Sequence, residues 1–367
     1  MAKILITGGH LAPALAVIEE LKKTKKNIEI IFVGRKYALD SEKTISLEYK
    51  EITKLKIPFI SLTAGRLTRV LTLRSLRNFL RLPIGFFNAF FIVRDQKPDV
   101  VLSFGSYLAV PIVFWAYLFK IPSFTHEQTV RPGLANIIIS LFAKKIFVAF
   151  PEAKHYFNPG KTLITGNPVR KSIFIVKKIP FPIAPGFPVI YITGGSLGSH
   201  SINEHIKKII PKLVHDFIVI HQVGETKEYG DYEGLLKIKQ SLPRGFQNRY
   251  FLSKHFFEDE IGYIYSRSDL IVGRAGANTF FELIALQKPA IFIPLPWSAG
   301  REQQRHAEIF ARAGCGEIFH QVEPSTKLLR LINSMIKNID LYKKNFGQLS
   351  IQNPTDGDKK IAAAVLT

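Results

Sequence analysis

A run of apolar residues that ends in two glycines occurs twice, about half a chain apart. Residues 4–9 read Ile-Leu-Ile-Thr-Gly-Gly, and residues 190–195 read Ile-Tyr-Ile-Thr-Gly-Gly. Runs that are apolar throughout are typical of parallel strands buried on both faces, and the glycines allow the following turn to approach a ligand closely. Each turn is followed by a helical pattern, and strand-like runs alternate with helical patterns along the rest of the chain. The sequence therefore predicts a doubly wound α/β architecture that is built twice.

A length of 367 residues exceeds that of most single domains and favours two. Between the two glycine turns, Ile179–Pro188 contains four prolines and a glycine, which indicates a linker. We predict two Rossmann-like domains that face each other across a cleft, at residues 1–178 and 189–355, with a linker at 179–188. The predicted strands are Lys3–Thr7, Glu29–Val33, Asp99–Ser103, Ile121–Thr125, Lys145–Ala149, Val189–Thr193, Phe217–His221, Leu270–Gly273 and Ala290–Pro294.

The chain is strongly basic, with 50 lysines and arginines against 29 aspartates and glutamates and a formal net charge of +21. Such an excess attracts either nucleic acid or an anionic membrane surface. No nucleic-acid recognition motif is visible, and we predict no nucleic-acid partner. The single cysteine, Cys315, is expected to be a small buried apolar residue. No charged, apolar leader precedes the first strand-like run, which argues against secretion.

Residues 66–81 form an arginine-rich apolar segment without an acidic residue. At helical spacing this segment would present an apolar strip rimmed by arginines, as in helices that lie in a lipid interface. The alternative is an ordinary amphipathic helix whose leucines face the core. The next stretch, Leu82–Val93, extends the apolar surface but is too short to span a bilayer. The residues predicted to form the membrane patch are Arg66, Arg69, Leu73, Arg74, Leu76, Arg77, Phe79, Leu80 and Arg81.

The first glycine turn reads Thr7-Gly8-Gly9-His10. It suits a diphosphate, because the N–H groups and the dipole of the following helix attract anions. His10, at the rim of the turn, has the chemistry of a general base. A purely structural turn is the alternative. The dinucleotide fingerprint G-x-G-x-x-G and a ribose-binding acidic residue after the second strand are both absent, which argues against a dehydrogenase.

Two motifs in the second half of the chain suit a sugar nucleotide. The second glycine turn, Gly194–Ser199, adds the hydroxyl of Ser196 to a row of backbone amides that can hold a phosphate. The segment Gly273–Glu282 follows a strand and opens a helix. Arg274 lies beside its turn, and the carboxylate of Glu282 can accept two hydrogen bonds from a ribose diol.

Two further motifs place polar side chains after apolar runs. Gln303 and Gln304 begin a helical pattern, and an amide both donates to and accepts from sugar hydroxyls. A capped, solvated helix start is the alternative. His126-Glu127-Gln128 superficially suggests a metal site, but the H-E-x-x-H spacing is absent because residue 130 is valine. We predict no catalytic metal.

Taken in order, the motifs form a specific set. It comprises Thr7–His10 with Pro13-Ala14-Leu15-Ala16, Phe104-Gly105 with Tyr107 and Pro111, His126-Glu127-Gln128 with Pro132–Asn136, Thr165–Arg170, Gly194–Gly198, His221-Gln222 with Gly224, Arg274–Glu282, and Gln303-Gln304. This set resembles the MurG family over nearly the whole chain. That family transfers N-acetylglucosamine from UDP-N-acetylglucosamine to undecaprenyl-diphosphoryl-N-acetylmuramoyl-pentapeptide, which forms lipid II of peptidoglycan synthesis.

The resemblance implies a GT-B glycosyltransferase fold, without a cofactor, at the anionic cytoplasmic face of the plasma membrane. The N-terminal domain would bind the acceptor and the C-terminal domain the UDP-sugar, and a helix within residues 356–367 would return to the first domain. The residues implied for the acceptor diphosphate are Thr7, Gly8, Gly9 and His10. Those implied for the donor are Arg170 and Ser196 on the diphosphate, Glu282 on the ribose, Phe257 near the uracil, Ala277, Asn278, Gln303 and Gln304 on the sugar, and, beside them, Arg274 and Thr129.

As a hypothesis, the C4 hydroxyl of the muramoyl sugar displaces UDP with inversion, and either His10 or Glu127 is the base. The sequence departs from the family pattern by a shorter first glycine loop, and by Ser106 for glycine, Thr129 for asparagine and Leu197 for glutamine. Two other functions stay open. One is transfer from the same donor to another lipid, and the other is a UDP-sugar epimerase of the same fold, against which the arginine-rich segment argues.

Overall fold

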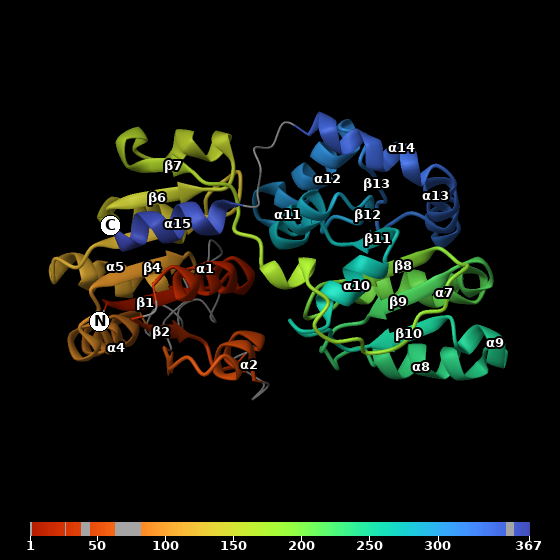
Figure 1. The fold of residues 1–367 in the computed structure, drawn as a ribbon, viewed down its shortest axis with the longest axis horizontal. Coiled ribbons are helices and arrows are strands. Elements are labelled where there is room, and N and C mark those ends of the chain that lie inside the picture. The colour runs from red at the N-terminus through yellow and green to blue at the C-terminus, as the bar shows by residue number, and fades with distance from the viewer. Residues whose placement is uncertain (1, 26, 38–44, 63–81, 350–355) are drawn as a thin grey trace. The chain divides into compact units, whose positions relative to one another are not determined.

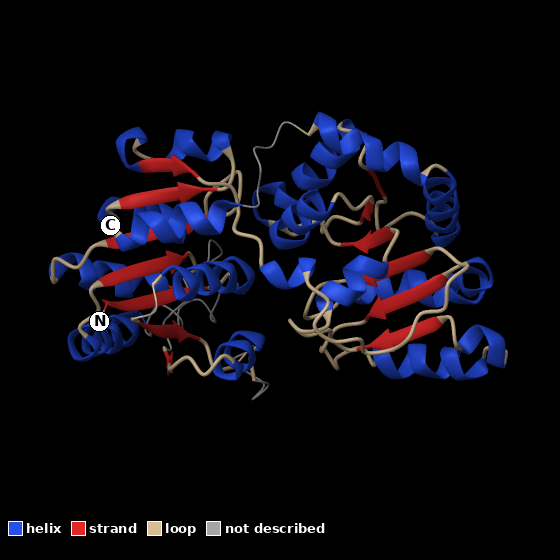
Figure 2. Cartoon of the chain, in the orientation of Figure 1, coloured by secondary structure: helices blue, strands red, loops and turns tan. Residues whose placement is uncertain are grey.

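The computed structural model describes residues 2–25, 27–37, 45–62, 82–349 and 356–367. The predicted membrane patch, Arg66–Arg81, lies outside these residues. The chain divides into two compact units, one of residues 1–170 with 352–367 and the other of residues 171–351. Each unit is an α/β structure in which helices cover a parallel sheet (Figures 1 and 2).

The described part of the first unit contains one seven-stranded parallel sheet in the order β3-β2-β1-β4-β5-β6-β7. Its strands are β1 (Ala2–Gly8), β2 (Ile28–Gly34), β3 (Phe59–Ser61), β4 (Val100–Phe104), β5 (Ser123–Glu127), β6 (Lys145–Val148) and β7 (Thr162–Ile164). Its helices are α1 (Leu11–Thr24), α2 (Leu47–Lys54), α4 (Leu82–Gln96), α5 (Ala109–Leu118), α6 (Leu134–Phe142) and α15 (Gly357–Leu366), with 3₁₀ turns at Pro151–Tyr156 and Pro159–Lys161.

The last helix closes the core of the first unit. In α15, Ile361, Ala362 and Val365 are buried in the same apolar cluster as Ile4 of β1 and Ile18 of α1. Their spacing places them on one face of the helix. Helices from the two ends of the chain therefore lie side by side on this sheet (Figure 1).

The described part of the second unit contains one six-stranded parallel sheet in the order β10-β9-β8-β11-β12-β13. Its strands are β8 (Val189–Thr193), β9 (Ile218–Gln222), β10 (Tyr250–Ser253), β11 (Leu270–Gly273), β12 (Ala290–Phe292) and β13 (Gly316–Ile318). Its helices are α7 (His200–Asp216), α8 (Asp231–Ser241), α9 (Arg244–Gln247), α10 (Ile261–Arg267), α11 (Ala277–Leu286), α12 (Glu302–Arg312), α13 (Ser325–Lys337) and α14 (Ile339–Lys344), with 3₁₀ turns at Lys171–Phe174, Ala299–Arg301 and Asn345–Gln348.

Each predicted strand is present, within two residues of its predicted bounds. The strand predicted at Ile121–Thr125 is shifted, because β5 runs from Ser123 to Glu127 and so contains His126 and Glu127. Cys315 is buried, as predicted, and burial raises the pKa of its thiol to about 11. Among the helices of the described ranges, none is both long and apolar enough to cross a membrane.

Both sheets have a point where the strand order reverses. In the first unit the chain passes from β1 outward to β3 and then returns to β4 on the other side of β1. In the second unit the same reversal places β11 beside β8. The carboxyl ends of strands at such a reversal are the usual ligand sites of open parallel sheets. Both glycine turns predicted from the sequence lie there.

Candidate active site

The first glycine turn connects β1 to α1 in close contact with the end of β4. A Cβ placed on Gly8 would lie 2.8 Å from the backbone nitrogen of Phe104, and one on Gly9 would lie 2.9 Å from Cβ of Ser106. Both distances are shorter than real Cβ contacts, so glycine is required for the two strand ends to approach. The turn thus brings β1 and β4 together at the reversal point of the sheet.

His10 is held at the N-terminus of α1 by the same strand end. Its Nδ1 lies 2.8 Å from the carbonyl oxygen of Phe104. Because a carbonyl oxygen only accepts hydrogen bonds, Nδ1 must carry the proton and donate it. The neutral ring then has its lone pair on Nε2, which is the state that a general base needs.

Glu127 is 2% exposed, and both of its oxygens accept two hydrogen bonds. Oε1 accepts from the backbone N–H and the hydroxyl of Thr129, at 2.9 and 2.8 Å. Oε2 accepts from Nδ2 of Asn136 at 2.8 Å and from the N–H of Gly133 at 3.3 Å. The Thr129 hydroxyl has a single proton and also lies 2.7 Å from the carbonyl oxygen of Arg131, so at least three donors are fixed on a carboxylate that offers about four lone-pair positions. Glu127 fastens the loop between β5 and α6, and this loop includes Thr129.

His126 is fully buried beside Glu127 and is a fixed structural group. Its Nε2 donates to the carbonyl oxygen of Gly166 at 3.2 Å. Burial lowers the pKa of the imidazole to about 3, so the ring is neutral at ordinary pH. The neutral ring thus connects the end of β5 to Gly166 in the segment that follows β7.

Three polar atoms at this edge of the sheet are left for a ligand. Within the described residues, Thr7 Oγ1, Gln128 Oε1 and Asn167 Oδ1 are buried and have no hydrogen-bond partner. They belong to residues in or directly after β1, β5 and β7, whose carboxyl ends share one edge of a parallel sheet. Buried polar atoms are usually satisfied in folded proteins, so such a set favours a ligand there.

The second glycine turn is packed against the loop after β9. A Cβ on Gly198 would lie 2.1 Å from the carbonyl oxygen of Val223, and Gly198 has a left-handed φ of +84°. Gln222 joins the turn to the segment after β10, because its Nε2 donates to the carbonyl oxygen of Gly195 at 3.1 Å and its Oε1 accepts from the N–H of Phe256 at 3.0 Å. The side chain of Gln222 therefore connects the turn that contains Ser196 to the segment that contains Phe257.

Arg274 fastens the second glycine turn from the other side. Its guanidinium donates to the carbonyl oxygen of Ile293 at 2.8 Å and to the hydroxyls of Ser199 and Ser201 at 2.7 and 2.8 Å. Burial lowers the pKa of this guanidinium to about 10, which leaves it charged at neutral pH. The structure thus places Arg274 in contacts that hold β11, the segment after β12 and the start of α7 together.

Helix α11 carries three of the predicted donor residues in its first two turns. Glu282 is 4% exposed, and its Oε2 accepts from the hydroxyl of Tyr265 at 2.8 Å. Ala277 is buried at the N-terminus of the helix. Oδ1 of Asn278 is a buried atom without a hydrogen-bond partner in the described part of the chain. The N-terminus of α11 therefore offers backbone N–H groups and one free side-chain acceptor.

The two glutamines at the start of α12 have different surroundings. Oε1 of Gln303 accepts from the N–H of Leu295 at 3.0 Å, which leaves its amide N–H groups for another partner. Nε2 of Gln304 donates to Glu308 at 3.0 Å, one turn along the same helix. Gln303 thus keeps both amide N–H donors for a ligand, whereas Gln304 keeps one N–H donor and its amide oxygen.

Two further residues predicted for the donor, Arg170 and Thr129, both lie in the first unit. Arg170 is half-buried at the end of the first unit, and Thr129 lies with Glu127 in that unit.

The sequence also contains an Asp-x-Asp pattern, at Asp356 and Asp358, which begins α15. Asp356 pairs with Lys360 at 3.1 Å, and Asp358 is 1% exposed.

The sequence did not single out three residues that position the site. Tyr265 holds Glu282, Ser199 holds Arg274, and Asn136 holds Glu127. Ser199 and Asn136 lie inside predicted motifs, but a serine or an asparagine there gives no sign of its partner. Tyr265 lies in the buried part of α10, where it resembles any other core residue.

Two parallel-sheet units, each with a glycine turn at its strand reversal, have the architecture of the GT-B fold. The chain matches the glycosyltransferase family 28 N-terminal domain over residues 7–148 and the C-terminal domain of that family over residues 189–360. A crystal structure of Acinetobacter baumannii MurG has the same fold, with a TM-score of 0.68 at 22% identity, over 100% of this chain and 99% of that one. So does a UDP-GlcNAc 2-epimerase from Neisseria meningitidis, with a TM-score of 0.66 at 17% identity over the whole of both chains.

Two curated relatives are similar over nearly their whole length, and both are named UDP-N-acetylglucosamine–N-acetylmuramyl-(pentapeptide) pyrophosphoryl-undecaprenol N-acetylglucosamine transferase. The one from Bacillus cereus is 33% identical and is covered over 94% of each chain. The one from Clostridium botulinum is 31% identical and is covered over 96% of each chain. The chain belongs to this family of transferases, the MurG family.

Proposed function

We propose that this protein transfers N-acetylglucosamine from UDP-N-acetylglucosamine to the C4 hydroxyl of undecaprenyl-diphosphoryl-N-acetylmuramoyl-pentapeptide, with inversion, and so forms lipid II. The observation that carries the proposal is its membership of a family whose named members catalyse this transfer. The glycine turn at the strand reversal of each unit supports it, because the reaction needs one diphosphate site for the donor and one for the acceptor lipid.

The second unit binds the donor. The turn Gly194–Ser199 and the N-terminus of α7, with the hydroxyl of Ser196, hold the diphosphate and receive its charge as UDP leaves. Arg170, the last residue of the first unit, stays a predicted diphosphate residue. Glu282, kept in place by Tyr265, accepts hydrogen bonds from the ribose. The sugar meets the N-terminus of α11 at Ala277 and Asn278 and the free amide of Gln303, and Gln304 lies beside it.

Arg274 acts on the donor through the glycine turn. Its contacts with Ser199, Ser201 and Ile293 use the planar fork of the guanidinium inside the protein. We therefore assign it the positioning of the turn, and not a direct contact with the sugar nucleotide. In the same way Thr129 is assigned to the loop that Glu127 anchors, in the first unit.

The first unit binds the acceptor. The turn Thr7–His10 holds the acceptor diphosphate, which the dipole of α1 attracts. Thr7 Oγ1 and Gln128 Oε1, buried and without partners within the described residues, are available to the acceptor at the same edge of the sheet.

His10 is the base, and Glu127 is not. His10 Nε2 takes the proton from the C4 hydroxyl as that oxygen bonds to the anomeric carbon, and the bond from that carbon to the diphosphate oxygen breaks with both electrons leaving on UDP. The hydrogen bond from Nδ1 to Phe104 supports this assignment, because it keeps the lone pair on Nε2. A proton added to Glu127 would have to compete with the N–H donors of Thr129, Gly133 and Asn136.

The protein binds to the cytoplasmic surface of an anionic membrane without spanning it. Beyond the arginine-rich segment, support comes from an apolar surface on α4, α5 and α6. Phe87 of α4 is 63% exposed, Tyr117 of α5 is 54% exposed and Leu141 of α6 is 69% exposed. A continuous chain of ring contacts connects these helices, through Phe87–Phe91, Phe91–Phe90, Phe90–Trp115, Trp115–Phe114, Phe114–Phe142 and Phe142–Tyr117.

The membrane assignment is tested by co-sedimentation with vesicles of neutral and of anionic lipids. Phe87→Ser and Leu141→Ser should weaken binding to anionic vesicles. Val322→Ser, which removes an apolar side chain that is 89% exposed in the second unit, is the matched control and should leave binding unchanged. Equal binding of all three variants and of the unchanged protein would refute the role of this surface.

The transfer is tested with the purified full chain, radiolabelled UDP-N-acetylglucosamine and the lipid-linked muramoyl-pentapeptide in detergent with EDTA. Labelled disaccharide-lipid is the expected product, and its formation in EDTA would support a reaction that needs no metal. Glu282→Gln should raise KM for the donor by about tenfold, because the ribose loses a charged acceptor. Glu323→Gln, which removes a carboxylate of the same unit whose side chain is 22% exposed, is the control.

Other products would identify the alternatives. Donor binding without transfer to this acceptor, but with transfer to another lipid, would refute the acceptor and retain the donor site. Conversion of UDP-N-acetylglucosamine into an epimer without any acceptor would refute the proposed transfer.

A further inference from the structure

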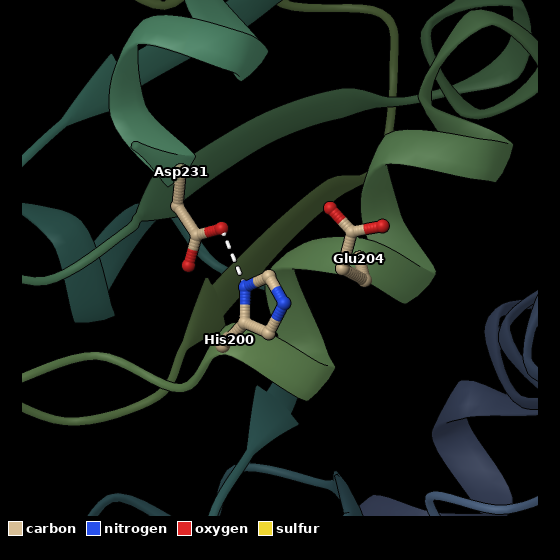
Figure 3. A group of neighbouring side chains, drawn as sticks. All are labelled: His200, Glu204 and Asp231. Atoms are coloured by element: carbon tan, nitrogen blue, oxygen red, sulfur yellow. Dashed lines mark hydrogen bonds and ion pairs between the residues drawn. The ribbon is translucent and has the colours of Figure 1, made fainter. Parts of the chain in front are cut away.

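A histidine and two carboxylates that the transfer does not use meet at the starts of α7 and α8. His200 and Glu204 are one helical turn apart on α7, and Asp231 is the first residue of α8 (Figure 3). One ligand atom from each lies within 4.8 Å of those from the other two. We propose that His200, Glu204 and Asp231 bind one divalent transition-metal ion, for which Zn²⁺ is the probe.

The spacing of the three side chains suits such an ion after a small movement. Bonds of about 2.0–2.1 Å in a tetrahedral site place neighbouring ligand atoms roughly 3.3 Å apart. His200 Nδ1 and Asp231 Oδ1 are 2.8 Å apart, so this pair must open slightly. Glu204 must move inward by at most about 1.5 Å to reach that spacing. Its side chain is 37% exposed, and the movement opposes only an exposed pair with Lys207.

Two of the three ligands are already oriented by residues behind them. Oδ2 of Asp231 accepts from Nδ2 of Asn203 at 2.8 Å, and Oδ1 of Asn203 accepts from Nε2 of the buried His221 at 3.1 Å. The ring of His200 stacks on Tyr229 with a centroid distance of 4.2 Å and an angle of 16° between the planes. Such outer contacts are typical of metal ligands, because they fix the orientation of each ligand before the ion binds.

The charge and the donor atoms favour a transition metal. The two carboxylates balance a divalent cation, and the competing partner, Lys207, pairs with Glu204 at 3.0 Å in an exposed salt bridge that contributes little. An imidazole nitrogen suits zinc better than magnesium, which prefers oxygen ligands throughout. Water would fill the remaining coordination position.

An ion at this place would stabilise the second glycine turn. His200 directly follows Ser199, and Asp231 follows the loop in which Glu225 and Thr226 donate their N–H groups to the carbonyl oxygens of Ser196 and Leu197. The ion would connect α7, which follows the glycine turn, to α8, which follows this loop. Its role is structural, and no step of the transfer passes through it.

The test is calorimetric titration of the EDTA-treated full chain with Zn²⁺ and, separately, with Mg²⁺, followed by thermal unfolding with and without zinc. We expect one Zn²⁺ per chain, no comparable Mg²⁺ binding, and a midpoint that rises by several degrees when zinc is in large excess over its Kd. His200→Ala and Glu204→Gln should each weaken zinc binding by at least about tenfold. Both residues are exposed enough for the variants to keep their fold, which circular dichroism checks.

The chain offers a matched control in His215, at the end of α7. His215 forms an exposed pair with Asp216 at 2.9 Å, and no third ligand is grouped with them in the described ranges. His215→Ala should bind zinc as the unchanged protein does. The proposal is overturned if the unchanged protein binds no zinc, or if His200→Ala and Glu204→Gln bind it as tightly as His215→Ala does.

Discussion

The substitution His10→Asn separates the two functions that the structure gives to this side chain. Nδ2 of an asparagine lies about where Nδ1 of a histidine lies, so it can donate to Phe104 over the present 2.8 Å. The variant keeps the hydrogen bond, which contributes about 0.5–1.5 kcal/mol to stability, but has no group in the place of Nε2. We therefore expect an unchanged thermal midpoint and unchanged binding of UDP-N-acetylglucosamine.

The turnover number of His10→Asn should fall by 10² to 10⁴, the usual contribution of general-base catalysis. This corresponds to about 2.7–5.4 kcal/mol in the activation free energy. The assay is initial-rate kinetics with both substrates varied. His10→Ala is the companion variant and should lose stability as well as turnover. A fall of less than about tenfold in kcat for His10→Asn would show that His10 is not the base.

Three further substitutions test the surroundings of the site. Glu127→Gln places an amide N–H group against N–H donors. We therefore expect a lower thermal midpoint and at least about tenfold lower turnover, with unchanged UDP affinity. A normal thermal midpoint would contradict the anchoring role. Arg274→Lys loses the planar fork, so calorimetry should show UDP bound about tenfold more weakly. Arg249→Lys is the control, because this guanidinium contacts backbone carbonyls and the ring of Phe187 and not the glycine turn, and it should bind UDP normally. Burial raises the pKa of Glu48 to about 7, so between pH 4.5 and 7 the folded state holds a proton that the unfolded state has lost. The free energy of unfolding therefore falls as the pH rises through this range. Glu48→Gln should flatten this decline in denaturant titrations, and an unchanged decline would contradict the assignment.

The sequence predicted the interior strands of both sheets and missed the edge strands. Strands such as β1 and β8 are covered on both faces, so they appear as continuous apolar runs. The missed strands are β3, β7, β10 and β13, the outermost strands of the two sheets. These are short and partly exposed, and a mixed run of three or four residues has no period to detect.

The sequence could predict which residues have useful chemistry, but it could not predict which of them are already engaged. Arg274 and Glu127 both have side chains suited to a ligand, and both are occupied by partners within their own unit. The partners lie 9 residues away for Glu127 and 75 residues away for Arg274. Contacts of this kind depend on the packed fold. His10 differs, because its place at the end of a strand and the start of a helix is a local property of the sequence.

The return of α15 to the first unit also bears on how the protein folds during synthesis. A ribosome that has released residues 1–170 has not yet made Ile361, Ala362 and Val365, which complete that core. Residues 171–351 are contiguous, so the second unit can fold as soon as it emerges. The first unit must therefore keep part of its apolar surface uncovered until Ile361, Ala362 and Val365 have been translated.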